Sequence, residues 1–580
     1  MRKVLILMFS CGLVGLFTFG ILKAKTASEI EADFSFGAKY KGFVVTKSLD
    51  IPELQCHLTE LTHEESQAQV VHIQASDPEN LFCISFRTYP TSSNGVAHVL
   101  EHTSLKGSKK FPVNNPFNAM KRRSLSTFMN AMTGPDYTCY PAASQVEEDF
   151  YNLFSVYLDA VFNPLLDPMA FAQEGHRLEF ANSLDATTPL EHKGVVYNEM
   201  KGALSSPYRL LLREVSKELF PGSPYAYNAG GDPEEIAKLT HQDLVDFHKT
   251  HYQPSNCIFF FYGDIPLHKH LDFLSANAFQ GLNDKNRALA AIPPQKRFSE
   301  PVRKECLYPS AEKETQNKDI ISFSWLTGQV TDNEELLALT ILDCILMNTD
   351  ASPLKSKLVK SGLCKEANSS LDVTRTDIPY ILYFEGCNGK DADALEACIR
   401  TALQEFCQTG PTEKQIARAL HQIELARSEI AGGSSPFGLD LFSRCALAKQ
   451  HGGQAEDGIR IHSHFEKLKV ALQKNPKLFQ DLVKKHLLTN AHLVRLVMKP
   501  SSELAEIEAK KERLSLDSIQ KELTVKDKEQ ILANAKELRD YQEKTDVDPL
   551  PKISAQAVPK KARSFDLKKQ TLGNAALGSL

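Results

Sequence analysis

The chain has 580 residues, of which 42% are hydrophobic and 24% charged, and its formal net charge is −5. This length and composition predict a globular protein of two to four domains. The slightly acidic balance provides no basic surface for nucleic acid, so we expect no nucleic-acid partner. Twelve cysteines are scattered without a Cys-x-x-Cys pair, which argues against a structural zinc ribbon and against a disulfide-dense scaffold.

The chain begins with an uncharged run from Val4 to Leu22, flanked on both sides by cationic residues. The run is longer than the apolar core of an ordinary signal peptide and slightly shorter than a spanning helix. We therefore expect residues 1–25 to be an export signal or a membrane anchor. An exported protein would be periplasmic or attached to the membrane.

Residues 30–275 have the pattern of one α/β unit. Short apolar stretches at 70–74 and 81–87 predict strands, and a turn sequence separates them. Residues 90–95 then break the pattern, and Asn94 is placed to cap a following helix.

The helix expected after Asn94 contains the motif His98-Val-Leu-Glu101-His102. Residues three and four apart share a helix face, so both imidazoles can face one metal ion with Glu101 beside them. Catalytic zinc usually has three protein ligands and one water, and a nearby carboxylate can accept a proton from that water. This is the inverted zinc-protease motif, with Glu101 as the expected base. Taken alone, the motif also fits a surface helix with two solvated histidines.

Further strands are expected at 124–131 and 137–140, around the turn Gly134-Pro135-Asp136. An edge strand there could pair with an extended peptide. Asn130 is the polar residue that we expect near such a substrate. An ordinary strand asparagine, satisfied by a neighbouring loop, explains the residue equally well.

The third metal ligand has no local signature. Helical patterns at 146–161, 169–181 and 193–204 follow the motif. A carboxylate from any element that folds back onto the helix of His98 and His102, the metal helix, could be the third ligand. Spacing leaves four candidates open: Glu174, Glu179, Glu191 and Glu199.

Residues 95–108 resemble the pitrilysin/insulinase clan of metallopeptidases, and within it the presequence proteases. Other segments carry the same resemblance: 124–131, 136–141, 155–160, 173–179, 194–202, 230–233 and 251–256. The resemblance implies that His98, His102 and Glu199 bind Zn²⁺ and that Glu101 is the general base. It also implies short unstructured peptides as substrates, cleaved in a closed chamber, and a cytoplasmic or organellar location as the alternative to export. One departure is His176, where the family usually has Trp.

Residues 300–500 are expected to form a second α/β unit that duplicates the first. Asp243-Leu-Val and Asn256 recur as Asp481-Leu-Val and Asn490, each time around a helix followed by an apolar strand. Two coincidental helix–strand pairs are the alternative explanation. The second unit lacks the metal motif, so we expect it to bind no metal and to form a wall of the substrate chamber. Its cysteines are expected to be small buried apolar residues.

Residues 501–548 are rich in Glu, Lys, Leu and Ala, with apolar residues at helical intervals. They predict two amphipathic helices that separate near residues 523–526 and form a hairpin linker. Residues 549–580 form an irregular tail. Presequence proteases continue from such a hairpin into a second half, so we expect this tail to be the start of a half that is absent.

The sequence therefore predicts an α+β protein with two homologous α/β-sandwich domains and a helical hairpin. The predicted function is that of a zinc metalloendopeptidase acting on short unfolded peptides. The alternative is a truncated, non-catalytic peptide-binding or assembly subunit that needs a partner. That partner would be a separate C-terminal-half polypeptide or a second copy of this chain.

Overall fold

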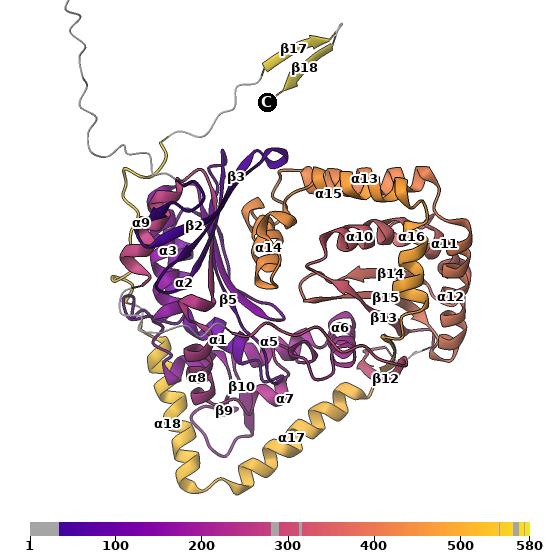
Figure 1. Ribbon diagram of the computed structural model, residues 1–580. Helices are drawn as coiled ribbons and strands as arrows, with labels where there is room; N and C mark the ends of the chain where they lie inside the picture. Colours follow the sequence, from indigo (N-terminus) through magenta and orange to yellow (C-terminus); the bar gives the residue numbers. More distant parts are fainter. Residues whose placement is uncertain are drawn as a thin grey trace, which may run out of the picture.

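The computed structural model describes residues 34–279, 289–312, 316–544, 546–560, 568–572 and 575–579. Two mixed β-sheets form the centres of two α/β units, and a pair of helices forms a V below them (Figure 1). The predicted α+β class with two sandwich-like units and a helical hairpin is confirmed. The run from Val4 to Leu22 lies outside the described residues. Within the described ranges, no helix is long and apolar enough to cross a membrane.

The first unit is built on a nine-stranded sheet. Its order is β1-β2-β3-β4-β11-β5-β8-β6, and β7 also pairs with β8. Among the strand pairs in the described part of this sheet, only β4–β11 is parallel. The strands are β1 Lys39–Tyr40, β2 Phe43–Ile51, β3 Cys56–His63, β4 Gln69–Ala75, β5 Asn80–Arg87, β6 Ser126–Met129, β7 Met132–Thr133, β8 Tyr137–Ser144 and β11 Cys257–Gly263.

The central strand β11 is buried on both faces, which explains its uninterrupted apolar sequence. Side chains alternate along a strand, so Phe259 and Phe261 pack on the side of α3 (Glu147–Phe162) and α9 (Leu267–Asn277). Phe260 faces the other way and contacts Phe442 of α14 (Phe437–Gln450), a helix that comes from the second half of the chain.

The second sheet repeats the strand order of the first. Its order is β12-β16-β13-β15-β14, and of its described strand pairs only β12–β16 is parallel. The first sheet has β4-β11-β5-β8-β6 in the corresponding places, with the parallel pair at the same position. The strands are β12 Val302–Pro309, β13 Asp319–Gln329, β14 Glu366–Leu371, β15 Asp377–Cys387 and β16 Leu493–Ser501.

The recurring asparagines Asn256 and Asn490 make similar hydrogen bonds in the two units. Asn256 Nδ2 donates to the carbonyls of Arg87 (2.9 Å) and His251 (2.7 Å), which joins the end of α8 (His241–His251) to β5. Asn490 Nδ2 donates to Leu326 and His486, both at 3.0 Å, and so joins the helix before β16 to β13. In each unit the asparagine thus bonds to a carbonyl of the neighbouring strand and to one near the end of the preceding helix, which agrees with the predicted duplication.

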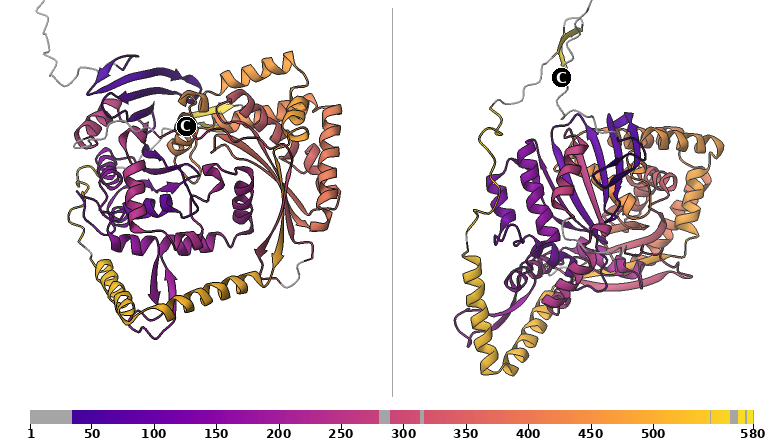
Figure 2. Two further views of the ribbon diagram at one scale, coloured as in Figure 1. Left: turned by 60° about the horizontal axis from the view of Figure 1, so that its bottom comes forward. Right: turned by 60° about the vertical axis from the view of Figure 1, so that its left-hand side comes forward.

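The two units exchange covering helices. As α14 packs on the first sheet, α6 (Pro207–Leu219) of the first unit lies against the second sheet (Figure 2). Leu211 and Val215 of α6 belong to the same apolar cluster as side chains of that sheet. The opposite face of the second sheet is covered by helices of its own unit. Helices around the second sheet are α10 Asn333–Met347, α11 Pro353–Lys360, α12 Ala392–Thr409, α13 Glu413–Ser428, α15 His462–Lys474 and α16 Leu478–Val483.

The linker hairpin consists of α17 (Leu504–Glu522) and α18 (Val525–Gln542). The turn lies at the predicted place, because Thr524 and Asp527 form a reciprocal cap at the start of α18. Figure 1 shows α17 running beneath both units and α18 returning along the first unit. Within the tail, β17 (Lys568–Leu572) and β18 (Ala575–Ser579) pair antiparallel.

One expected helix, 169–181, is wrong in its second half. Helix α4 (Pro168–Glu174) ends at Gly175, and β9 (Arg177–Phe180) then pairs with β10 (Leu190–Lys193). A Cβ at Gly175 would lie 2.9 Å from a methyl group of Val99 on the metal helix. Glycine at 175 therefore permits the close approach of the two segments where the helix ends, and local periodicity carries no information about this contact.

Candidate metal and catalytic site

The metal helix α1 (Val96–Ser104) is preceded by its N-cap residue Gly95, which has φ +66°. A Cβ at Gly95 would lie 2.8 Å from the Cα of Gly231, so glycine is needed both for the backbone conformation and for the close approach of the two segments. Asn94 Oδ1 accepts from the Val96 amide at 3.1 Å. The predicted cap is therefore present, one residue ahead of the cap position.

Hydrogen bonds on Nδ1 fix the orientation of both imidazoles of the motif. His98 Nδ1 donates to the carbonyl of Gly230 at 3.0 Å, and His102 Nδ1 donates to Glu174 Oε2 at 3.1 Å. With Nδ1 carrying the proton, Nε2 of each ring presents a lone pair. A carbonyl or carboxylate behind a histidine ligand is the usual support of a metal site.

Glu199, on α5 (Val195–Ala203), faces both lone pairs. Its Oε2 lies 3.9 Å from His98 Nε2 and 3.8 Å from His102 Nε2. The ligand atoms of these three residues lie within 4.8 Å of one another. Two lone pairs and a carboxylate would repel one another unless a cation lay between them. Tetrahedral zinc bonds of about 2.0–2.2 Å place ligand atoms about 3.3–3.5 Å apart, so the donor set fits zinc after a small closure.

The other candidate carboxylates lie elsewhere. Glu174 stands behind His102 and also pairs with Lys106 at 2.9 Å. Burial raises the pKa of Glu174, but these two partners outweigh it and hold the pKa at about 2, so the group is a carboxylate at neutral pH. Glu179 pairs with Arg177 and Lys193, and Glu191 lies 3.6 Å from Lys193.

Glu101 lies beside the cluster, with only 7% of its surface exposed. Its Oε2 accepts a hydrogen bond from Thr133 Oγ1 at 2.6 Å. Burial raises the pKa of Glu101, and the Thr133 hydroxyl and the two histidines oppose that rise. A buried carboxylate with a raised pKa suits a general base, because its pKa is closer to the operating pH. A bound cation would lower that pKa again.

Asn130 lies between β6 and β7, at the edge of the first sheet. Its backbone amide donates to Pro141 and its carbonyl accepts from Tyr157, while the residue itself is exposed. The structure thus places Asn130 on the segment that leads to Thr133, outside the metal cluster.

Sequence reasoning missed three supporting groups: the Gly230 carbonyl, the role of Glu174 behind His102, and Thr133. The segment Gly230-Gly-Asp-Pro233 stands out in the sequence through resemblance alone, and the close approach of Gly231 to Gly95 explains its glycines. Thr133 is one residue from a glycine–proline turn, which carries no signal of contact with Glu101.

The unusual His176 lies behind the site, in a small ring cluster. Its Nε2 is 2.7 Å from His192 Nδ1, and both rings contact Tyr197 of α5. Burial lowers the pKa of His176 to about 4, so the ring is neutral at physiological pH. His176 therefore takes part in packing around α5 without entering the metal cluster.

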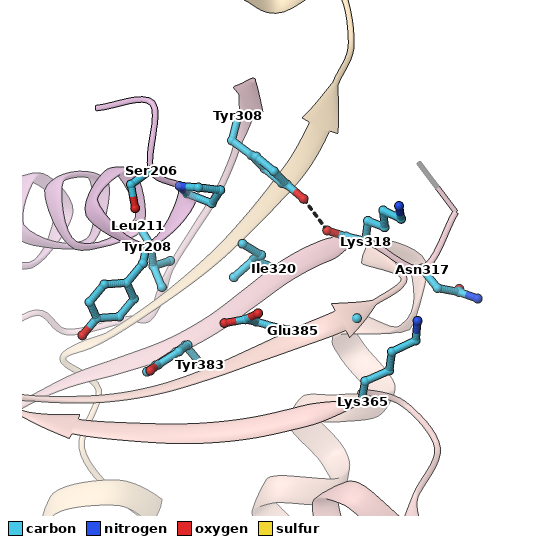
Figure 3. Close-up of a pocket in the computed structure, with 12 residues that line it drawn as sticks. Ser206, Tyr208, Leu211, Tyr308, Asn317, Lys318, Ile320, Lys365, Tyr383 and Glu385 are labelled. Atoms are coloured by element: carbon cyan, nitrogen blue, oxygen red, sulfur yellow. Dashed lines mark hydrogen bonds between the residues drawn. The ribbon is translucent and has the colours of Figure 1, made fainter. Parts of the chain in front are cut away.

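A cavity of about 370 Å³ lies apart from these residues, between α6 and the second sheet (Figure 3). Tyr308 closes one side by donating a hydrogen bond to the Lys318 carbonyl at 2.7 Å. The lining combines aromatic rings with two lysines and a glutamate. It consists of Ser206, Pro207, Tyr208, Leu211, Tyr308, Asn317, Lys318, Ile320, Lys365, Tyr383, Glu385 and Gly386.

Sequence comparison gives three matches to models of one peptidase family. "Insulinase (Peptidase family M16)" matches residues 87–191, and "Peptidase M16 inactive domain" matches 238–423. A third model, for a domain associated with subfamily C of these peptidases, matches 498–577. Mitochondrial presequence proteases are similar over most of the chain. That of Xenopus laevis is 34% identical over 551 residues, covering 94% of this chain and 53% of the relative. That of Mus musculus is 37% identical over 518 residues, covering 88% and 49%.

A bacterial relative, Protein HypA of Clostridium perfringens, is 32% identical over 530 residues, covering 90% of this chain and 54% of HypA. The chain thus spans about half the length of the curated relatives it matches.

Among solved structures, a protease from Helicobacter pylori superimposes with a TM-score of 0.58 at 19% identity, covering 76% of this chain and 99% of that one. The periplasmic protease PqqL from Escherichia coli gives 0.57 at 15% identity, covering 91% and 55%. These structures share the fold of the chain.

Proposed function

The chain belongs to the M16 (insulinase) family of peptidases and is related to presequence protease, and from this premise we propose that it is a zinc metalloendopeptidase of short unstructured peptides. The observation that carries the proposal is the convergence of His98, His102 and Glu199 beside a buried Glu101. Residues from two separate helices meet there with the donor set of a catalytic zinc site.

Zinc bound by these three residues would supply an activated water and polarise the scissile carbonyl. The chain's own residues supply the rest. His98 and His102 are held with Nε2 forward by Gly230 and Glu174. Thr133 Oγ1 donates a hydrogen bond to Oε2 of Glu101. We therefore assign Oε1 as the oxygen that receives the proton of the water and passes it to the leaving amine.

The peptide itself is proposed to lie along the edge of the first sheet. Strand β6 is the last strand of that sheet, and β7 continues along β8 towards Glu101. An extended peptide can add to such an edge by main-chain hydrogen bonds. Asn130, exposed between β6 and β7, is the side chain that we propose to contact it.

The test compares Glu101→Gln with the wild-type protein. We expect the variant to bind one zinc per chain and to cleave a quenched peptide about 10²–10⁴-fold more slowly, because it lacks the base. Glu191→Gln, at a half-exposed carboxylate near Lys193, is the matched control and should cleave normally. Cleavage by Glu101→Gln at the wild-type rate would remove the base assignment.

A second candidate function is a non-catalytic peptide-binding or assembly subunit that needs a partner half. The observation behind it is that the chain spans about half the length of its relatives. The partner would be a separate C-terminal-half polypeptide or another copy of this chain. Peptide cleavage with and without chelator, measured together with the mass in solution, separates the two functions: no cleavage by a zinc-loaded monomer would favour the subunit.

The cellular location is a further proposal that rests on the run from Val4 to Leu22. We propose export to the periplasm or attachment to the membrane, with the cytoplasm or an organelle matrix as the alternative. Cell fractionation of the full chain distinguishes these locations.

A further inference from the structure

Thr133 makes direct contact with the proposed base. It lies on the two-residue strand β7, which pairs with β8 at Met132–Cys139 and Thr133–Thr138. So short a strand does not hold a hydroxyl in place by itself. The turn that follows it, residues 134–136, therefore helps to set the position of Thr133.

That turn is anchored by a buried carboxylate. Asp136 has no exposed surface, and its Oδ2 accepts from Tyr225 Oη at 2.6 Å and from His451 Nε2 at 2.8 Å. Its Oδ1 accepts from Gln450 Nε2 at 3.2 Å. The Tyr225 hydroxyl also lies 2.7 Å from Thr376 Oγ1. A buried carboxylate that loses such donors suffers a large desolvation penalty, so the turn is held firmly.

Two of the three donors to Asp136 come from the second unit. Gln450 is the last residue of α14 and His451 follows it. Helix α14 is itself seated tightly on the first sheet: Phe442 contacts Phe260, and a Cβ at Gly438 would lie 2.7 Å from the Tyr262 ring. Helix α14 of the second unit thus packs on the first sheet, and the residues at its end donate hydrogen bonds to the turn next to Thr133.

We propose that Thr133 is a positioning residue for Glu101, and that the second unit holds it in place through the contact of His451 and Gln450 with Asp136. The inference rests on the proposed function for the role of Glu101. The second unit, which lacks a metal motif, would then contribute to the reaction by fixing the orientation of the Glu101 carboxylate.

The first experiment concerns the hydroxyl of Thr133. Thr133→Val keeps the shape and removes the donor, and we expect kcat for a quenched peptide to fall about tenfold, a part of what general-base catalysis contributes. KM and the zinc dissociation constant should not change. Thr133→Ser restores a hydroxyl and should recover most of kcat. Equal kcat values for the Val and wild-type proteins, or no recovery with Ser, would overturn the role of Thr133.

The second experiment tests the link between the units. His451→Phe removes the donor to Asp136 while keeping a ring, whereas His451→Gln keeps a donor. We expect a several-fold loss of kcat for Phe and recovery for Gln. Because His451 acts through Thr133, the double variant Thr133→Val/His451→Phe should be no slower than Thr133→Val alone. Additive losses would overturn the link.

Hydrogen exchange provides a readout that does not depend on catalysis. His451→Phe should speed exchange of the backbone amides of residues 132–138. Lys304→Gln is the matched control, because it breaks another contact between the units, the 3.6 Å ion pair of Lys304 with Glu218, and should leave those amides and kcat unchanged. An inactive wild-type protein would remove the proposed function, and the exchange result would still decide whether the second unit holds the turn.

Discussion

The orientation of single side chains decides whether three residues from two helices can form a metal site. Each imidazole is tied at Nδ1, one to a carbonyl and one to a carboxylate, so neither ring has to be ordered when a metal binds. Glu199 differs, because about half of its side-chain surface is exposed. Its contribution is therefore mostly its charge and its place on α5.

Removing that charge should weaken metal binding. Glu199→Ala leaves two neutral imidazoles, so we expect zinc occupancy after dialysis to fall well below one ion per chain, measured by metal analysis. The matched control is Glu191→Ala, which removes a nearby carboxylate that faces Lys193 and should keep full occupancy. Full occupancy in Glu199→Ala would require another third ligand.

One carboxylate of the second unit, Glu335, makes the stability of the protein depend on acidic pH. Glu335 on α10 accepts from His486 Nε2 at 3.0 Å and pairs with Lys485. The hydrogen bond from His486, and then the Lys485 charge, outweigh burial and hold the pKa of Glu335 at about 2, below the usual 4.5. A carboxyl with a depressed folded-state pKa stabilises the protein above the unfolded pKa, and this stabilisation is lost as the pH falls towards 2.

We expect Glu335→Gln to be less stable than wild type at pH 6 by about 1–2 kcal/mol, a value reduced for solvent screening of a partly exposed pair. The difference should shrink between pH 4.5 and 2, as the carboxylate becomes protonated. Urea unfolding at several pH values measures it. A difference that stays constant over this range would show that lost packing, and not the charge, destabilises the variant.

The start of α1 is constrained both by its backbone conformation and by its neighbours. Gly95 combines a left-handed backbone with a close approach to the backbone of Gly231, and the adjacent Gly230 carbonyl orients His98. A displacement of the 230–231 loop would therefore also displace the helix start.

Gly95→Ala should lower stability by about 2 kcal/mol or more, since it adds backbone strain and a clash with main chain. It should also weaken zinc binding, because the displaced loop carries the partner of His98. Gly202→Ala is the control: that glycine lies on α5 with open space around it, and alanine should stabilise the helix by about 0.5–1 kcal/mol. Thermal unfolding and chelator competition test both variants, and unchanged zinc affinity in Gly95→Ala would separate the loop from the site.

The exchanged helices α6 and α14 each pack against the sheet of the other unit, so we expect the two units to fold together. One continuous apolar core contains residues of both units, among them Phe260, Phe442 and Leu382. Because this shared core is packed like the interior of a single domain, we expect neither unit to unfold by itself.

Phe442→Ala should cost about 3–5 kcal/mol, because it leaves a cavity in that core. Trp325, the single tryptophan, lies on β13 of the second unit, so its fluorescence reports that unit while circular dichroism reports both. The two urea transitions should coincide in wild type and in Phe442→Ala. The exposed Phe36 gives a control, since Phe36→Ala should change stability by less than about 0.5 kcal/mol. Separate transitions would show independent units.

Local signals in the sequence were sufficient to predict the metal helix, most strands and the hairpin linker. Helix spacing, strand alternation and capping depend on near neighbours in the chain. Resemblance selected Glu199 from four carboxylates. Tertiary structure decided what neighbours along the chain do not encode: that Glu174 stands behind His102, that helix α4 stops where it meets Val99, and that Thr133 reaches Glu101. These contacts join segments tens to hundreds of residues apart, and their positions follow from how the two sheets and their exchanged helices pack.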